Sequence, residues 1–203
     1  MGKLLIGLLF VLTAAGVPAA PLKVVNVAAP AINCVFTTAS PCTIGVHDSS
    51  AEVPMSAGGT GRLQSRTFVG KAESPAAGLF AYEYRLNLAD TVGAVKIACI
   101  DWMTISFGPV VNTLDYDGDQ KPDQVFVVTG GGVGTIGLAS AVQTADTIRF
   151  KFSKPVCEGG APGGEGDSSF FWGLVSKSPP KDVTAILHET GGATHVVKAR
   201  SPT

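Results

Sequence analysis

A strict alternation of apolar and polar side chains over residues 80–88 limits the folds open to this chain more than any other feature. Apolar residues at every second position from Phe80 to Leu88 alternate with alanine, glutamate, arginine and asparagine. Successive side chains of a strand point to opposite faces, so this pattern predicts a β-strand with one buried and one solvated face.

Further strand-like runs recur along the chain, separated by glycine, proline, aspartate and serine. They cover residues 23–28, 34–38, 42–47, 62–69, 95–100, 103–107, 124–128, 147–152, 169–175, 182–188 and 195–199. Beyond the N-terminal segment, only residues 138–145 approach a helical period, for two turns at most. Closely spaced strands without helices predict an all-β fold, an antiparallel β-sandwich or jelly-roll-like single domain.

The first residues of the chain have the pattern of a secretory signal peptide. A short positive region, Met1 to Lys3, precedes an apolar run that ends at Val17 and is short for a membrane span. Cleavage after Ala19 is preferred over cleavage after Ala20, and an uncleaved anchor is the alternative. We therefore expect a signal peptide at 1–19 and a secreted, cell-surface or periplasmic domain at 20–203.

Composition indicates two loops and separates the start of the mature domain from the rest. Residues 49–61 and 158–169 are rich in glycine, serine and alanine. The first of these loops marks residues 20–60 as a candidate for a semi-separate N-terminal hairpin region. The formal net charge of −1 predicts no nucleic-acid partner, and no later segment is apolar enough to span a membrane.

Four cysteines follow the signal peptide, and an even number in an exported chain favours disulfides. Three pairings are possible. We favour Cys34 with Cys42, because a Ser-Pro turn between them can bring both ends together, which leaves Cys99 with Cys157. The spacing does not fit a zinc site.

The loop "LDYDGDQKPDQVFVV", residues 114–128, concentrates negative charge in one turn. Carboxylates this close repel one another, and a calcium ion, which takes 6 to 8 oxygen ligands, relieves that repulsion. Gly118 permits the sharp turn between ligands. The predicted ligands are the side chains of Asp115, Asp117, Asp119 and Asp123 and the backbone carbonyl of Lys121.

The same residues, "DYDGDQKPDQVFVV", resemble the calcium loop of FG-GAP-type repeats, in which a DxDGDxxPD loop precedes a strand. The resemblance covers about 15 residues and one copy of the loop. It implies calcium as the bound ion, with the aspartates at 115, 117, 119 and 123 as ligands. Position 12 of the loop is Phe126 instead of a glutamate, so an EF-hand is not expected. Asp167 is a weaker candidate for a second calcium site.

Two other features resemble functional signals, a glycine motif and a set of histidines. Gly132, Gly134 and Gly137 spell GxGxxG, with Glu158 in the place of a ribose-binding acid, but the next strand follows too soon for a dinucleotide-binding helix. The three histidines, His47, His188 and His195, lie in strand-like segments without a nucleophile motif. They are expected to be surface strand residues.

Carboxylates and aromatic residues supply the remaining candidates. Glycoside hydrolysis needs a carboxylate pair, which Glu52, Glu73, Glu83 and Asp101 could furnish, and Glu83 stands out because it lies on the polar face of an aromatic strand. An aromatic platform for a sugar ring could form from Trp102, Phe170, Phe171 and Trp172. Core packing is the favoured alternative for Phe170 and Phe171.

Together these features predict a secreted, calcium-stabilised, disulfide-containing β domain with a non-catalytic binding or structural role at the cell surface or outside the cell. Expected partners are carbohydrate or another envelope or extracellular protein. Two alternatives stay open: a secreted glycoside- or ester-type hydrolase with a structural calcium, and a passive envelope subunit.

Overall fold

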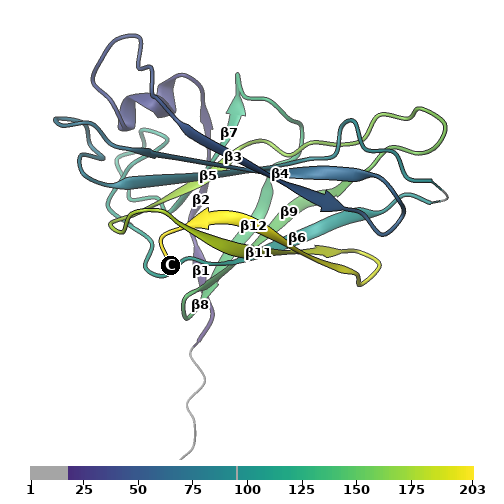
Figure 1. Cartoon of the computed structure of the whole chain (residues 1–203). Helices are drawn as coiled ribbons and strands as arrows, with labels where there is room; N and C mark the ends of the chain where they lie inside the picture. The colour runs from purple at the N-terminus through teal and green to yellow at the C-terminus, as the bar shows by residue number, and fades with distance from the viewer. Residues whose placement is uncertain (1–17, 95) are drawn as a thin grey trace, which may run out of the picture.

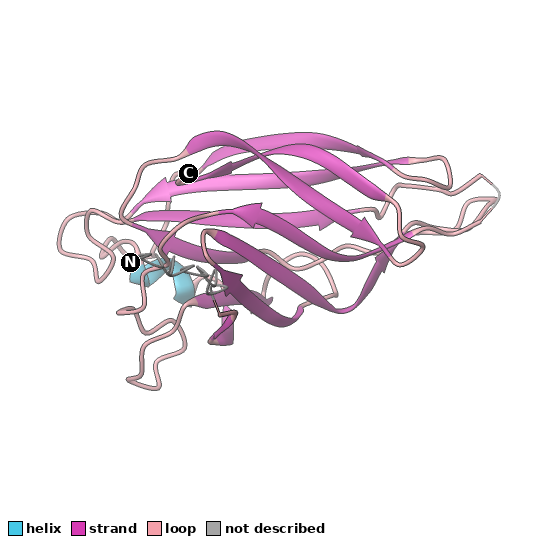
Figure 2. Cartoon of the chain, turned by 90° about the horizontal axis from the view of Figure 1, so that it is seen from below, coloured by secondary structure: helices cyan, strands magenta, loops and turns pink. Residues whose placement is uncertain are grey.

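The computed structural model describes residues 18–94 and 96–203 and shows a β-sandwich of two six-stranded sheets (Figures 1 and 2). This confirms the predicted fold class. The predicted signal peptide lies, except for its last two residues, outside the described residues. Sheet A has the order β1-β8-β9-β6-β11-β12, and sheet B the order β2-β7-β10-β5-β4-β3.

Each sheet draws its strands from the whole length of the chain. Sheet A contains β1 (Ala20–Leu22), β6 (Cys99–Ser106), β8 (Leu138–Thr144), β9 (Thr147–Cys157), β11 (Lys181–Glu189) and β12 (Thr194–Ser201). Sheet B contains β2 (Val24–Ala28), β3 (His47–Pro54), β4 (Thr60–Val69), β5 (Phe80–Asn87), β7 (Val125–Gly130) and β10 (Trp172–Ser176). One short 3-10 helix, η1 (Ala31–Val35), lies beside the sandwich, coloured cyan in Figure 2.

Neighbouring strands are antiparallel with one exception, the parallel pair β2 and β7. The strands of residues 20–60 are distributed over both sheets: β1 pairs with β8, β2 with β7, and β3 with β4. The short connection through Lys23 therefore takes the chain from sheet A to sheet B.

The main core fills the space between the sheets. Tyr82, Tyr84 and Leu86 of β5 point into it and are fully buried, as the alternation predicts. Trp172 of β10 packs against Phe150 and Phe152 of β9, which joins the two layers. Burial of large aromatic side chains of this kind dominates the stability of a sandwich.

The outer face of sheet B is also covered, which corrects the prediction that β5 has a solvated face. Ala81 and Glu83 point away from the main core and are nevertheless buried. A second apolar cluster lies over this face, built around Phe36 from the segment after η1 and Phe126 from β7. Glu83 of β5 therefore faces a small protein interior instead of bulk water, whereas Arg85 and Asn87 are partly exposed.

Several local predictions were wrong. Residues 34–38 end η1 and continue into irregular backbone, and residues 42–46 form a turn and irregular backbone instead of a strand. Residues 138–144 form β8 instead of helical turns. Part of the expected loop 49–61 is strand β3, which pairs only with β4 and has a single fully buried side chain, Val53. An edge strand buries too little to show the alternating pattern that sequence reasoning relies on.

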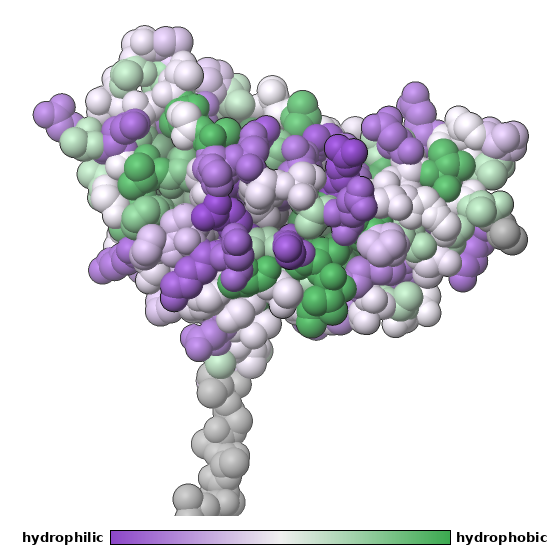
Figure 3. Space-filling model, in the orientation of Figure 1, coloured by the Kyte–Doolittle hydropathy of each residue, from purple (hydrophilic) through white to green (hydrophobic). Residues whose placement is uncertain are grey.

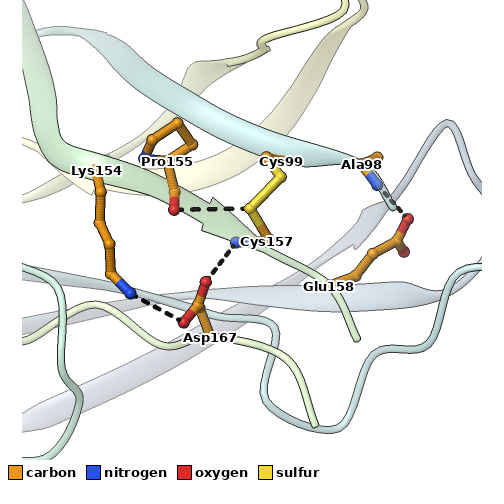
Figure 4. The surroundings of a disulfide bond; sticks show 7 residues. All are labelled: Ala98, Cys99, Lys154, Pro155, Cys157, Glu158 and Asp167. Carbon is orange, nitrogen blue, oxygen red and sulfur yellow. Dashed lines mark hydrogen bonds and ion pairs between the residues drawn. A yellow bond between two sulfur atoms is a disulfide. The ribbon is translucent and has the colours of Figure 1, made fainter. Parts of the chain in front are cut away.

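Both favoured cysteine pairs are disulfides. Cys34–Cys42 closes the segment that follows η1, and Cys99–Cys157 joins paired residues of β6 and β9. Figure 4 shows Asp167 beside the second disulfide, where it accepts a hydrogen bond from the Cys157 backbone and lies 3.6 Å from the Lys154 ammonium. Two disulfides fit an oxidising compartment.

The face shown in Figure 3 is mostly hydrophilic or neutral, with small separate hydrophobic patches. Within residues 18–94 and 96–203, no helix has the length and apolar character needed to cross a membrane.

Candidate functional sites

The acidic loop, residues 114–123, is closed at its base by an isolated β-bridge. The Asp123 amide donates to the Leu114 carbonyl at 2.7 Å, immediately before β7 begins. Gly118 and Gln120 have positive φ values of 85° and 65°, so the backbone turns sharply twice between the aspartates. The rigid strand that follows and the bridge together hold the carboxylates close to one another.

Three of the four predicted carboxylate ligands converge. One oxygen from each of Asp115, Asp117 and Asp123 lies within 4.8 Å of the others. Asp119 lies outside this group, because the Lys121 amide and ammonium donate to it at 2.8 and 3.2 Å. The hydrogen bond from the Lys121 amide, more than its charge, lowers the pKa of Asp119.

Backbone amides compensate much of the charge in the loop. Asp115 accepts hydrogen bonds from the amides of Gly118 and Gln120, and Asp117 accepts one from Asp119. Asp123 is fully buried and accepts a 2.8 Å bond from the Tyr116 amide. These local bonds fix the direction of each carboxylate.

Lys23 is a member of this site that sequence reasoning missed. Its ammonium lies 2.7 Å from Oδ1 of Asp123 and 3.6 Å from Asp119, and the contact with Asp123 raises the pKa of Lys23. The parallel pairing of β2 with β7 brings the start of β2 beside the loop. A pairing between segments 100 residues apart leaves no local signal in the sequence.

The chemistry of the converging group suits a hard cation. A calcium ion holds each oxygen ligand at about 2.3–2.6 Å, so oxygens within 4.8 Å of one another can share one ion. Three carboxylates on a hydrogen-bonded loop provide the charge and the oxygen type that calcium prefers. The Lys23 ammonium would then pair with Oδ1 of Asp123, the oxygen that does not accept the Tyr116 amide bond.

A second feature is a hollow on the covered face of sheet B, with a volume of about 380 Å³. We call it the Glu83 pocket. Its floor includes Arg66 of β4 and Glu83 of β5, which are directly opposite each other in register, together with Phe171. Its walls come from the segments at Ala29–Asn33, Ile44–Val46 and Gly131–Val133.

The strand register places opposite charges side by side on the pocket floor. Asp48 of β3 is opposite Arg66, and the two form a 2.7 Å ion pair. On the β10 side, Glu83 is opposite Gly173 in register. The Phe126 ring packs against Gly173, where a Cβ would lie 2.4 Å from the nearest ring atom. Arg66 also lies 4.0 Å above the Phe171 ring centroid.

Glu83 is the least compensated charge in this pocket. The side chain is 6% exposed, and within the described part of the chain no residue donates a hydrogen bond to its carboxyl group. Burial raises the pKa of Glu83 to about 7, although Arg66 acts in the opposite direction. Arg66 has a counter-ion in Asp48, whereas Glu83 has none within ion-pair distance.

The glycine-rich loop contributes to this pocket and holds no nucleotide-binding helix. It links β7 to β8, so a strand follows the glycines. Gly134 has φ of 104°, and a Cβ there would lie 2.1 Å from the Ser169 carbonyl, so close backbone packing explains this glycine. Glu158 is buried and accepts a bond from the Ala98 amide.

The four aromatic candidates do not form a platform. Trp172 lies in the main core, Phe171 on the opposite face of sheet B under Arg66, and Phe170 packs at the edge of the main core. Trp102 lies on the outer face of sheet A, stacked on His188 of β11 with ring centroids 3.3 Å apart. That stacking covers one face of the indole ring.

The other titratable candidates are spread over the molecule. His47 is exposed on β3, Glu52 and Glu73 are exposed, and Asp101 pairs with Lys151. His195 shares a 2.8 Å hydrogen bond with Glu189, which also accepts bonds from the amide and hydroxyl of Ser56. The carboxylate lies between serine and histidine, so His195 is not placed to take a proton from that hydroxyl.

No family model, curated protein or solved structure is significantly similar to this chain. The acidic loop and the Glu83 pocket are two places in the described structure where polar groups converge on a possible ligand site.

Proposed function

We propose that the protein is a secreted β-sandwich domain that binds calcium at the acidic loop and has a non-catalytic binding role outside the cell or at its surface. The convergence of Asp115, Asp117 and Asp123 within 4.8 Å carries this proposal. The resemblance of the loop to that of FG-GAP-type repeats supports calcium as the ion. The disulfides and the signal-peptide pattern support export.

Calcium bound in this loop would increase the stability of the folded protein. The loop lies in the connection between β6 and β7, and β7 is an inner strand of sheet B. An ion that binds only the closed loop adds its binding free energy to the folding free energy. The described residues show no arrangement of nucleophile and base that favours the hydrolase alternative, and carbohydrate or another extracellular protein stays the proposed partner class.

Thermal unfolding of residues 20–203 with calcium or with a chelator tests the ion site. We expect calcium to raise the melting temperature by several degrees, since a calcium concentration of 100 times Kd stabilises by about 2.7 kcal/mol. The variant Asp117→Asn should lose this effect because it removes a converging ligand. The matched variant Asp119→Asn should keep most of it because Asp119 is held by Lys121.

Two results would contradict this assignment. Equal melting temperatures of the wild type in calcium and in chelator would mean that the loop needs no ion. Equal losses in the two variants would mean that the structure places the ligands wrongly, and that all four aspartates act together as the sequence alone suggests.

A further inference from the structure

The Glu83 pocket contains a buried carboxyl group for which the described residues provide no hydrogen-bond donor or counter-ion. Burying a carboxylate without a hydrogen bond or counter-ion is costly, and most proteins avoid it. Glu83 is 6% exposed, and that exposure is toward the pocket, whose surface it lines. A group of this kind marks a place where a ligand can supply the missing interaction.

The charges around Glu83 decide which ligand fits. Asp48, Arg66 and Glu83 lie side by side across β3, β4 and β5, and of these Arg66 and Glu83 line the pocket. The first two neutralise each other at 2.7 Å, and Arg85 on the same strand as Glu83 directs its guanidinium to Gln64 and Ser168. Among the described residues, the other pocket-lining positions carry no charged side chain. Arg85 bonds neutral groups and does not line the pocket, so the lining charge that lacks an ion partner in the described structure is the negative charge of Glu83.

The walls of the pocket are apolar. Ile32 and Ile44 form one wall, on the segment that the Cys34–Cys42 disulfide closes, and Val128 and Val133 form the other. Its volume of about 380 Å³ lies at the lower end of the range for small-ligand pockets, about 300–1,000 Å³. A ligand with a short hydrocarbon chain would contact these walls while its polar end reached Glu83.

We propose that the Glu83 pocket binds a small organic cation, a primary ammonium group on a short apolar stem, with the ammonium against the Glu83 carboxylate and the stem between the two walls. This inference goes beyond the proposed function, whose partner class is carbohydrate or another extracellular protein, and it is independent of the acidic loop. The proposed ligand is a free small amine and not part of a longer polymer chain.

Binding of such a cation is coupled to the protonation of Glu83. Burial raises the pKa of Glu83 to about 7, so the free protein holds a proton there at acidic pH. An ammonium ion stabilises the charged carboxylate, so binding below pH 7 releases that proton. The affinity of the pocket for the amine should therefore rise from pH 5 to about pH 7 and change less above pH 7. An alkylamine stays protonated throughout this range.

The test uses n-pentylammonium chloride as the probe, with n-pentanol as a neutral probe of nearly the same shape. Binding to residues 20–203 is followed by the methyl NMR signals of Ile44 and Val133, which place the ligand in this pocket. We expect n-pentylammonium to bind about 10- to 100-fold more tightly than n-pentanol at pH 8, the range expected for a charge-assisted hydrogen bond. We expect at least tenfold weaker binding of n-pentylammonium at pH 5.

The variant Glu83→Gln should bind n-pentylammonium about as weakly as n-pentanol, and its binding should no longer depend on pH. Glu52→Gln, a change at an exposed position of β3, is the matched control and should bind like the wild type. Val133→Trp changes a residue that is 53% exposed at the mouth of the pocket, so it should block both probes without disturbing the core.

Any of three results would overturn the proposal: equal affinity for the two probes at pH 8, unchanged n-pentylammonium binding in Glu83→Gln, or signal changes that avoid Ile44 and Val133. The calcium effect on the melting temperature is measured on the same samples. Loss of amine binding with calcium stabilisation intact would refute this inference alone, and the reverse result would refute the calcium site alone.

Discussion

Two buried carboxyl groups, Asp123 and Glu83, show how the surroundings of an acidic residue determine its role. Asp123 is fully buried but receives a hydrogen bond from the Tyr116 amide and a contact from the Lys23 ammonium. Glu83 is almost as buried and has neither kind of partner in the described structure. The first therefore has partners inside the loop, whereas burial of the second carries a free-energy cost that depends on pH.

The free-energy cost of burying the charged Glu83 carboxylate predicts how the stability of the protein varies with pH. Its pKa is about 7 in the folded protein against an ordinary value of 4.5, so the folded state binds the proton more tightly. Stability from this group is fully present below pH 4.5 and is lost as pH rises through 7. Relative to Glu83→Gln, the wild type should lose roughly 3 kcal/mol over this range.

Urea unfolding of both proteins between pH 4 and pH 8 measures this difference. The groups facing Glu83 are Arg66 and Asp48, and they remain in the variant, so the comparison isolates one carboxyl group. Stability curves of wild type and variant that run parallel across the whole pH range would show that the carboxyl group is hydrated or paired in solution.

At the scale of elements, the segment from η1 to residue 46, which we call the covering segment, buries the outer face of β5. β5 has the alternation of a strand with one wet face, yet Phe36 and its neighbours cover that face. The covering segment has little regular structure, and the Cys34–Cys42 disulfide holds it together. The second disulfide instead links two strands that are already paired, β6 and β9.

The two disulfides should contribute unequally to stability. Cys99–Cys157 spans 58 residues and Cys34–Cys42 spans 8, and a longer closed loop restricts the unfolded chain more. Replacing both members of the first pair by alanine should cost about 4 kcal/mol, and of the second about 2.5 kcal/mol. Urea unfolding of the two double variants checks this order.

Hydrogen exchange separates the local roles of the disulfides. Loss of Cys34–Cys42 should increase exchange mainly over residues 31–46, because only the covering segment is released. A larger loss of stability from the short disulfide than from the long one would mean that the covering segment, and not the unfolded chain, determines its contribution.

At the scale of the whole molecule, hydrogen bonds between the two sheets add to the apolar core in holding the sheets together. The Tyr84 hydroxyl of sheet B donates to the Arg200 carbonyl of sheet A at 2.6 Å. Glu189, at the end of β11 in sheet A, accepts bonds from the amide and hydroxyl of Ser56 in the turn between β3 and β4 of sheet B. His195 contacts Oε1 of the same carboxylate, the oxygen that also accepts the Ser56 amide bond.

The Glu189 tie predicts a pH dependence opposite in sign to that of Glu83. Burial acts to raise the pKa of Glu189, but the bonds from Ser56 and His195 outweigh it, and the pKa is lowered from 4.5. Its stabilising contribution is present above pH 4.5 and is lost as pH falls through the lowered pKa. Glu189→Ala should cost about 2–4 kcal/mol at pH 7, because it removes several hydrogen bonds to one charged group.

Chemical denaturation of Glu189→Ala at pH 7 and pH 3 checks this prediction, with the conservative variant Glu189→Gln expected to lose less. The stability difference from wild type should shrink at the lower pH. A difference that is equal at both values would place the loss in packing instead of in the charged tie.

Some of the site was predictable from sequence because it is local. The four aspartates and Gly118 lie within nine residues, and the conformation of such a loop depends mainly on its own hydrogen bonds and turns. The Ser-Pro turn between Cys34 and Cys42 is equally local. Lys23 and the pairing of Arg66 with Glu83 were not predictable, because they depend on which strands become neighbours in the sheet.

The amino-acid sequence by itself determined the all-β class, the inward direction of Tyr82 and Tyr84 and the place of the acidic loop, because each follows from periodicity or from residues close together in the chain. The tertiary structure alone decided that the second face of β5 is covered, that Asp119 turns to Lys121, and that Glu83 lies in a pocket without a counter-ion. The physical reason is that burial and charge compensation are properties of neighbours in space. In a sandwich whose sheets interleave distant strands, those neighbours come from segments far apart in the sequence.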